Sequence, residues 1–275
     1  MTDSVPDPRT PDQYSRTDYR RVIAWKARIE REGPFLTALL ERAPDRSVLD
    51  VGCGTGEHTA FFSRLGARSV GLDRSETMIA AARDHETDGN SSSSRFFVGE
   101  ATTMHETLAS ESPFGLALCL GNMLPHLLAR EELDLLLTGA RSVLAPGGLL
   151  LVQLLNYRRL LDQKVRHLPL NVRESESGQE IVFLRLLQPI SDERILFFPT
   201  TLVLEPDGEE PVSIKSTQRV ELRPWTDRDL RPAFEQQGFE LERYGDMQGG
   251  RFNAETSNDL ILVATRRSTE CSPGS

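Results

Sequence analysis

The segment DVGCGTGEH (residues 50–58) constrains this chain more than any other part of it. Its glycines alternate with small residues directly after an apolar run at 47–49, which is typical of a buried strand. Glycine tolerates positive φ angles and allows a ligand to approach the backbone closely. A strand, a glycine turn and the N-terminus of a helix form a cradle that favours an anionic group. The same pattern also fits an ordinary tight turn between a strand and a helix.

The spacing of these glycines narrows the class of ligand. Gly52, Gly54 and Gly56 are spaced GxGxG, whereas the dinucleotide-binding fingerprint is GxGxxG. Glu57 stands where the last fingerprint glycine would be, and its carboxylate would oppose a pyrophosphate. A P-loop needs a Gly-Lys-Ser/Thr sequence, and this segment has no lysine. The pattern therefore favours a ligand without phosphate groups.

Predicted strands and helices alternate along the first part of the chain. The expected strands occupy 47–51, 69–72, 95–98, 114–120 and 149–154, and the expected helices 57–65, 76–84 and 131–144. Several strands are continuously apolar, which predicts a parallel sheet covered on both faces. Ser75 is expected to cap the helix at 76–84. Gly33-Pro34 is expected to divide the helical stretch at 19–42 into two helices, and residues 145–148 are expected to form a turn.

Residues 165–223 change character, because segments rich in Val, Ile, Phe and Thr replace the helical periodicity. We expect three or four antiparallel strands here, inserted after the fifth strand of the sheet, at 181–187, 194–204 and 211–222. The chain then returns to a helix at 226–237 and strands at 239–244 and 260–265. Thr226 with Asp229 resembles a capping box at the start of that helix.

Composition excludes several classes of protein. The formal charge is −9, and an acidic surface repels nucleic acid. Cys53, Cys119 and Cys271 are widely spaced with no CxxC pair, which argues against a metal centre and against a disulfide framework. The N-terminus lacks the apolar core of a signal peptide, and no apolar run reaches the ~20 residues of a membrane helix. We therefore expect a cytoplasmic protein without membrane or nucleic-acid partners.

Four motifs in chain order resemble the class I S-adenosylmethionine-dependent methyltransferases. DVGCGTG resembles their motif I, and GLDRS places Asp73 at the end of the second strand. Gly99-Glu100-Ala101 follows the third strand, and LAPGGLLLV (144–152) leads into the fifth. The resemblance covers about residues 20–160 and 225–265. It implies an α/β, Rossmann-like, doubly wound and mostly parallel seven-stranded sheet, with the antiparallel β insertion after strand five.

The resemblance also divides the chain and assigns the cofactor site. Together with the composition and the strand pattern, it predicts a flexible tail at 1–18, a cofactor-binding core at 19–164 and 224–266, an inserted roof over the acceptor site at 165–223, and a second flexible tail at 267–275. Asp73 would bind both ribose hydroxyls, and Glu100 and Ala101 would meet the adenine edge, although either acid could instead be a surface residue. The residues implied in S-adenosylmethionine binding are Trp25, Arg28, Asp50, Gly52, Cys53, Gly54, Gly56, Asp73, Arg74, Glu100, Ala101, Leu120 and Gly121.

Two further segments resemble the glycine and sarcosine N-methyltransferases. CLGNMLPHLL (119–128) follows the fourth strand, and the resemblance implies that Asn122 and His126 face the acceptor. Asn122 as a turn residue and His126 as a buried hydrogen-bonded histidine are the alternatives. Asn156-Tyr157 resembles the Asn-Tyr pair after strand five. Asn122, His126 and Tyr157 are the candidate catalytic residues, and no metal is expected.

The N-terminal segment at 19–35 resembles the helical lid of the bacterial enzymes in that group. Trp25 and Arg28 lie one helical turn apart, so both side chains can face one site. Arg28 could bind the methionine carboxylate with its two-pronged guanidinium. The alternative is a core tryptophan beside a solvated arginine.

These features predict methyl transfer to a small-molecule acceptor, by an enzyme that is a monomer or a homodimer. An amine acceptor is favoured. The alternatives are an O-methyltransferase with His126 as base, or a binding module without catalysis. Leu155 stands where glycine N-methyltransferases have a substrate-binding arginine, which predicts a larger, less anionic acceptor. The arginines that could replace the missing charge are Arg158, Arg159, Arg185 and Arg219.

Overall fold

The computed structural model describes residues 23–87, 94–174 and 179–267. The tail predicted at 1–18 lies outside the described residues, and so does the tail predicted at 267–275 except for its first residue. Among the described helices, none is long and apolar enough to cross a membrane.

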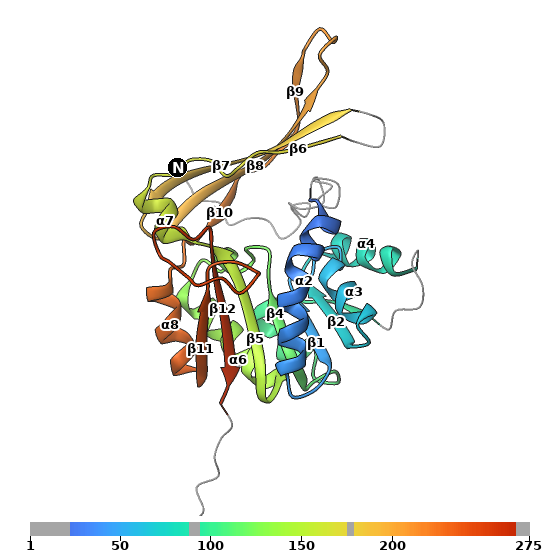
Figure 1. Ribbon diagram of the computed structural model, residues 1–275, viewed down its shortest axis with the longest axis vertical. Helices are drawn as coiled ribbons and strands as arrows, with labels where there is room; N and C mark the ends of the chain where they lie inside the picture. The colour runs from blue at the N-terminus through green and yellow to red at the C-terminus, as the bar shows by residue number, and fades with distance from the viewer. Residues whose placement is uncertain (1–22, 88–93, 175–178, 268–275) are drawn as a thin grey trace, which may run out of the picture.

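The main sheet has seven strands in the order β11-β12-β5-β4-β1-β2-β3 (Figure 1). The strands are β1 (Ser47–Val51), β2 (Arg68–Asp73), β3 (Arg95–Val98), β4 (Phe114–Cys119), β5 (Leu144–Leu155), β11 (Phe239–Tyr244) and β12 (Asp259–Arg266). Only β12 runs antiparallel to its neighbours β5 and β11. The predicted fold class is confirmed. The strand order reverses between β1 and β4, and ligands of open α/β sheets bind beyond the carboxyl ends of the strands at such a point.

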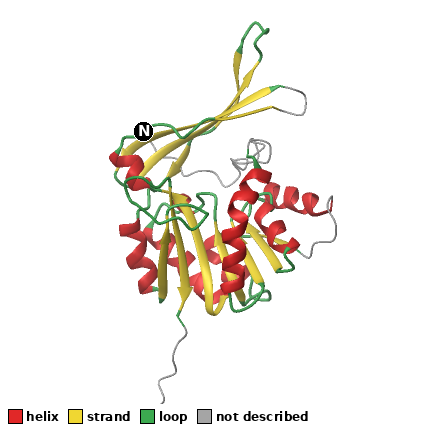
Figure 2. Ribbon diagram, in the orientation of Figure 1, coloured by secondary structure: helices red, strands yellow, loops and turns green. Residues whose placement is uncertain are grey.

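Helices cover both faces of this sheet (Figure 2). They are α2 (Trp25–Arg42), α3 (Glu57–Arg64), α4 (Glu76–Thr87), α5 (Met104–Thr107), α6 (Arg130–Val143), α7 (Tyr157–Asp162) and α8 (Asp227–Gln236), with short 3₁₀ turns at Ala101–Thr103 and Leu124–His126. Adjacent strand residues enter two separate cores: Val48 packs in the core that includes α2, and Leu49 packs in the core that includes α6 and α8. Burial on both faces explains why these strands are continuously apolar.

Helix α2 is continuous, so the predicted division at Gly33-Pro34 is wrong. Proline inside a helix removes one hydrogen bond, but its φ angle is compatible with the helix. Gly33 faces the ring of Phe61, and a Cβ at this position would lie 3.4 Å from that ring. Leu36 and Leu39 are fully buried. Packing of this face on the sheet outweighs the local cost of Pro34.

The segment predicted as a turn at 145–148 is part of β5, which begins at Leu144. The pairing with β4 passes from Leu144 opposite Phe114 to Leu149 opposite Leu116, so the intervening residues form a bulge. Gly147 has a φ of 74° there. The turn prediction was wrong because a glycine bulge and a glycine turn share the same local signal.

A second sheet, here called the roof sheet, lies over the carboxyl edge of the main sheet (Figure 1). Its five described strands exceed the predicted three or four, because the expected strand at 211–222 is two strands and a further strand at Asn171–Glu174 was not predicted. They are β6 (Asn171–Glu174), β7 (Glu180–Ser191), β8 (Arg194–Leu204), β9 (Val212–Thr217) and β10 (Val220–Leu222).

Both predicted caps are present. The amide of Met78 donates to Ser75 Oγ at 3.1 Å, which closes the first turn of α4. The amide of Thr226 donates to Asp229 Oδ2 at 2.9 Å, which fixes the start of α8 directly after the roof sheet.

Candidate active site

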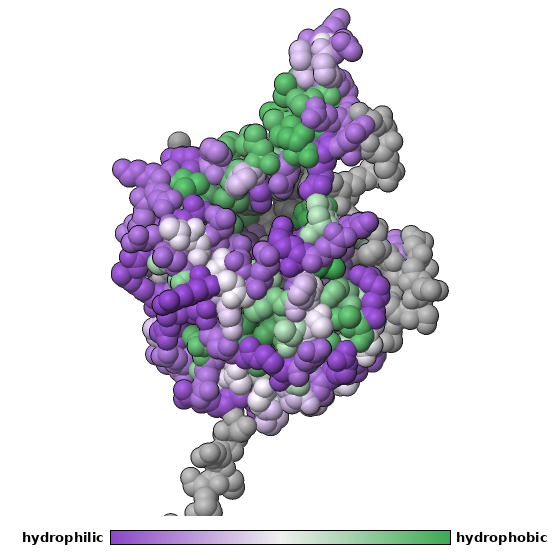
Figure 3. All heavy atoms as spheres, in the orientation of Figure 1, coloured by the Kyte–Doolittle hydropathy of each residue, from purple (hydrophilic) through white to green (hydrophobic). Residues whose placement is uncertain are grey.

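A cavity of about 1120 Å³ lies between the carboxyl edge of the main sheet and the roof sheet. Figure 3 shows the surface hollowed beneath the roof. Its walls come from the ends of β1, β2, β4 and β5, from α2, from the roof sheet and from the loop between β11 and β12. It therefore occupies the position at which an open α/β sheet binds its ligand.

The glycine turn after β1 forms part of this wall. Gly52, Gly54 and Gly56 all have positive φ angles, of 72°, 54° and 82°. A Cβ at Gly52 would clash with Met123, and one at Gly56 would lie 2.9 Å from Phe96, so packing requires glycine at both positions. A Cβ at Gly54 would meet nothing within 4 Å, and Gly54 lines the cavity. The turn thus leaves room for a ligand at Gly54.

Asp73 at the end of β2 holds that turn in place. Its Oδ2 accepts a hydrogen bond from the amide of Gly54 at 2.9 Å, and its Oδ1 accepts one from the amide of Ser75 at 2.9 Å. A carboxylate oxygen can accept more than one hydrogen bond, so Asp73 keeps the capacity to bind a ligand hydroxyl. Arg74, Glu100 and Ala101 line the cavity beside it.

The remaining predicted cofactor residues also gather here. All thirteen line the cavity except Gly56, whose position is set by packing under the turn. Asp50 is buried and accepts a hydrogen bond from Thr59 Oγ1 at 2.9 Å. Burial raises the pKa of the Asp50 carboxyl and that of the Cys53 thiol. Cys53 is thus a protonated packing residue at neutral pH.

Helix α2 contributes a buried donor to the cavity. The indole Nε1 of Trp25 is buried and has no hydrogen-bond partner among the described residues. The guanidinium of Arg28 lies 5.1 Å from the centre of the Trp25 ring, and His58 packs edge-on against the same ring. An unsatisfied buried N–H is costly unless a ligand acceptor meets it. This orphaned donor fits a ligand with a carboxylate.

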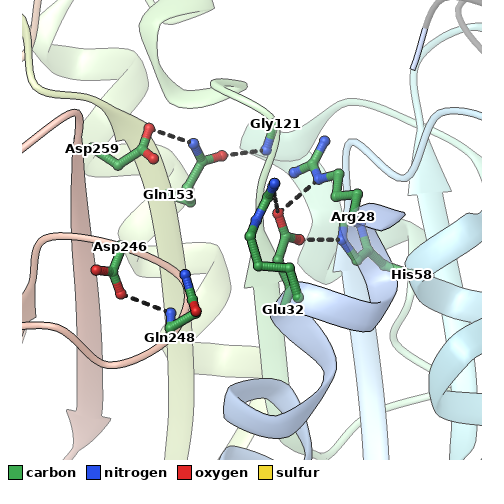
Figure 4. A network of polar contacts seen from close by, with 9 residues as sticks. Arg28, Glu32, His58, Gly121, Gln153, Asp246, Gln248 and Asp259 are labelled. Carbon is green, nitrogen blue, oxygen red and sulfur yellow. Dashed lines mark hydrogen bonds and ion pairs between the residues drawn. The ribbon is translucent and has the colours of Figure 1, made fainter. Parts of the chain in front are cut away.

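A polar network around Glu32 was missed by sequence reasoning (Figure 4). Glu32 is 3% exposed; its carboxylate accepts from Arg28 Nε at 2.9 Å and lies 3.1 Å from His58 Nε2. Burial alone would raise the pKa of Glu32, but the hydrogen bond with His58 and the charge of Arg28 together bring it below its usual value. The four-residue spacing of Arg28 and Glu32 was a usable local signal. The pairing of Glu32 with His58, 26 positions away, gave no local signal in the sequence.

A second polar network that was not predicted from the sequence joins Gly121, Gln153 and Asp259 at the edge of the cavity (Figure 4). Gln153 Oε1 accepts from the amide of Gly121 at 2.8 Å, and its Nε2 donates to Asp259 Oδ1 at 3.0 Å. Burial raises the pKa of Asp259. These bonds tie the loop after β4 to β5 and β12, so Gly121 is held at a defined position in the wall.

Asn122 and Tyr157 are joined to each other. Asn122 has a φ of 63°; its Oδ1 accepts from the amide of Leu155 at 3.0 Å and its Nδ2 donates to Tyr157 Oη at 2.8 Å. Asn122 lines the cavity, whereas Tyr157 does not and is 1% exposed. Burial raises the pKa of Tyr157. The structure therefore brings Asn122 to the cavity and places Tyr157 behind it.

His126 lines the cavity from the 3₁₀ turn after β4. Burial, and then the positive charge of Arg74, lower the pKa of His126 to about 4. Its imidazole is therefore neutral at neutral pH and can donate or accept a hydrogen bond.

The candidate arginines are less available than the sequence alone indicated. Arg159 lines the cavity, but its Nε donates to Ser257 O at 3.1 Å and its Nη2 to Asn258 Oδ1 at 3.0 Å. Arg185 lines it as well, and donates to Pro169 O at 2.9 Å. Arg158 and Arg219 do not line it. Leu155, Phe183 and Phe197 form apolar parts of the same wall.

Residues 48–148 match the model of a family described as "Methyltransferase domain". Over 148 residues the chain is 34% identical to a glycine/sarcosine N-methyltransferase of Parasynechococcus marenigrum, an alignment that covers 52% of this chain and 49% of the relative. The chain thus spans about half the length of this curated relative.

Two solved structures are similar over most of their length. One is an S-adenosylmethionine-dependent methyltransferase from Clostridium acetobutylicum, with a TM-score of 0.70, 15% identity, and coverage of 93% of this chain and 96% of the other. The other is the sugar N-methyltransferase KedS8 from Streptoalloteichus, with a TM-score of 0.69, 22% identity and 98% coverage of both chains. At these identities the likeness establishes the fold. The matched family model assigns residues 48–148 to a methyltransferase domain, and the chain shares the fold of an S-adenosylmethionine-dependent methyltransferase of known structure.

Proposed function

We propose that the chain binds S-adenosylmethionine in the large cavity and transfers its methyl group to the nitrogen of a small-molecule amine. The observation that carries the proposal is the set of cofactor-type residues around that cavity, with twelve of the thirteen predicted positions in its wall. The cofactor, when bound, supplies a methyl group activated by its sulfonium charge.

The residues present fit that cofactor. The space at Gly54 and the carboxylate of Asp73 suit a ribose, and the buried N–H of Trp25 suits a carboxylate. Glu57 in the first turn of α3 is buried and would repel a phosphate, which favours a ligand without one. In this proposal Asp73 binds the ribose, Glu100 and Ala101 bind the adenine, and Trp25 with Arg28 binds the methionine end.

The chain's own contribution is to position the acceptor and to exclude water. Asn122 is held by Leu155 and Tyr157, so its side chain presents a defined surface to the cavity. Tyr157 acts in this proposal as a positioning residue behind Asn122. Apolar side chains of the roof sheet, such as Phe183 and Phe197, close the cavity from above.

The protonation state of His126 supports an amine over a hydroxyl acceptor. A base with a pKa of about 4 is poorly matched to a phenol, whose pKa is about 10. A neutral amine already carries the lone pair that attacks the methyl carbon, so it needs a hydrogen-bond acceptor more than a strong base. His126 in its neutral form supplies such an acceptor in this proposal.

The walls of the cavity support an acceptor larger than glycine. Leu155 offers no charge to a substrate carboxylate, and Arg159 is already engaged by Ser257 and Asn258. A buried carboxylate without a partner costs several kcal/mol. The similarity to a sugar N-methyltransferase over the whole chain is in line with a bulkier amine. We further propose a reducing compartment such as the cytoplasm, to which the free thiols of Cys53 and Cys119 are suited.

The test is an assay with methyl-labelled S-adenosylmethionine and a panel of acceptors. The panel contains amino sugars and other bulky amines, phenols, and the series glycine, sarcosine and dimethylglycine. Label transfer to bulky amines supports the proposal. Transfer to phenols alone would establish the hydroxyl alternative. Efficient methylation of glycine would overturn the predicted acceptor size, and cofactor binding without turnover on the whole panel would identify a binding module.

A further inference from the structure

A second cavity of about 400 Å³ lies beside α7, the start of α8 and the loop between β11 and β12. In Figure 1 these three segments lie on the same side of the molecule, next to the edge strand β11. None of its lining residues lines the large cavity. We infer that this second cavity is a binding site for a small oxyanion, a phosphate or a carboxylate.

The walls of this second cavity are rich in positive charge. Four arginines line this cavity: Arg158, Arg228, Arg243 and Arg251. Among the described residues, Asp227 is the only acid that lines it, and it is paired with Arg243 at 2.7 Å. Arg158 is paired with Asp162 at 3.5 Å. Such a concentration of positive charge is unusual in a chain of net charge −9 and attracts anions.

Two of these arginines are available for a ligand. The side chains of Arg228 and Arg251 make no hydrogen bond or ion pair with another described residue, and both residues are exposed at the cavity mouth. The guanidinium groups of arginine bind phosphate and carboxylate oxygens in a two-pronged geometry. An oxyanion in the cavity would satisfy both.

The backbone points to the same ligand chemistry. Helix α8 has ten residues and begins at Asp227, so its first N–H groups are at the cavity wall. The amides of Asp229 and Leu230 donate to Thr226 O, whereas those of Asp227 and Arg228 have no partner among the described residues. Free N–H groups and the dipole at a helix N-terminus favour an anion. They supply donors that are independent of the arginine side chains.

The inner wall of this cavity combines apolar side chains with one buried polar atom. Trp225 and Phe252 give this cavity an apolar floor, and Asp227 Oδ1 is buried without a partner among the described residues. That oxygen suits an O–H on the ligand, as in a monohydrogen phosphate. Tyr157 also lines this cavity, and its hydroxyl is bonded to Asn122 in the large cavity. The oxyanion site is thus separate from the candidate active site, and the hydrogen bond between Tyr157 and Asn122 connects the walls of the two cavities.

The experiment is calorimetric titration of the protein with inorganic phosphate and, separately, with acetate at low ionic strength. The test variant is Arg228→Gln combined with Arg251→Gln. The control is Arg231→Gln, which removes one positive charge from α8 at a residue that does not line the cavity. The comparison of phosphate with acetate identifies the preferred oxyanion.

We expect saturable binding of at least one of the two anions by the wild-type protein. The double variant should weaken it at least about tenfold, and the control should stay within about twofold. Absence of saturable binding, unchanged affinity in the double variant, or an equal loss in the control would each overturn the inference. A melting curve for each variant checks that the exposed substitutions leave the fold intact.

Discussion

His58 Nε2 lies 3.1 Å from Glu32 Oε2, and this contact joins α3, the helix that follows the glycine turn, to α2. Both side chains are buried, and both line the large cavity. Glu32 also binds Arg28, so one carboxylate organises the side of the cavity formed by α2. Changes at this pair should therefore affect the stability of the fold and the cofactor site together.

Glu32→Gln should destabilise the protein by about 3 kcal/mol at neutral pH, because it leaves Arg28 and His58 without their charged partner. Glu30→Gln on the exposed side of the same helix is the matched control and should change little. Thermal and urea unfolding measure the difference. Equal stabilities of the two variants would contradict a structural role for the buried network.

The contact between Glu32 and His58 also predicts that the free energy of unfolding depends on pH. The folded state lowers the pKa of Glu32 below its ordinary 4.5, so folding stabilises the ionised form. This contribution is fully present above pH 4.5 and is lost as the pH falls through the lower folded pKa. Urea unfolding across this range should show a smaller acid dependence for Glu32→Gln than for the wild type.

His126 should also make the free energy of unfolding depend on pH, in a range slightly higher than that of Glu32. The pKa falls from 6.5 to about 4 on folding, so the folded state holds the neutral form and stability is lost as the pH falls from 6.5 towards 4. This difference in pKa corresponds to about 3 kcal/mol at most. His126→Gln should flatten the stability profile in this window. A profile unchanged by the substitution would show that His126 titrates normally.

His126→Ala also tests the proposed role in the acceptor site. Turnover should fall roughly 10²-fold or more if the imidazole accepts the proton or a hydrogen bond from the acceptor. Cofactor affinity should remain within about threefold, since the proposal places His126 at the acceptor. Steady-state kinetics and calorimetry separate the two effects. A lower melting temperature with unchanged turnover would make His126 a structural residue.

Asp73→Ala should weaken the binding of S-adenosylmethionine at least about tenfold, because charge-assisted hydrogen bonds contribute roughly 1.5–3 kcal/mol each. The substitution also removes the acceptor for the amides of Gly54 and Ser75, so some loss of stability is expected. Glu76→Ala, one residue past the cap of α4, is a control that does not line the cavity. Calorimetry that finds unchanged affinity for Asp73→Ala would reject the ribose assignment.

A pair of glycine substitutions separates packing from ligand space in the glycine turn. Gly56→Ala places a methyl group 2.9 Å from the Phe96 ring and should cost about 1–3 kcal/mol of stability beyond the backbone strain. Gly54→Ala meets no neighbour, so its cost is the backbone strain of about 1–2 kcal/mol. Its methyl group enters the cavity, so it should reduce cofactor affinity more than Gly56→Ala does. The reverse order of affinities would place the ligand away from Gly54.

Features that depend on a few neighbouring residues could be determined from the sequence. The cap at Ser75 and the box of Thr226 with Asp229 follow from contacts within about four residues, and the glycine turn could be predicted because glycine tolerates positive φ angles. Continuous apolar runs were sufficient to predict the parallel strands, because burial on both faces leaves no polar alternation. The order of the motifs was sufficient to predict residues that line one cavity.

Only the tertiary structure decided features that join distant segments. The exposed Pro34 stays within one helix because Leu36 and Leu39 of that helix are buried in the core beside the sheet, and this packing outweighs a local helix-breaking signal. Arg159 is engaged by residues about a hundred positions away, and Gln153 meets Asp259 at a similar separation. Tyr157 lies behind the cavity wall because the ends of β4 and β5 meet at Asn122. Local propensity carries no information about such contacts, since they form only when the sheet has brought the segments together.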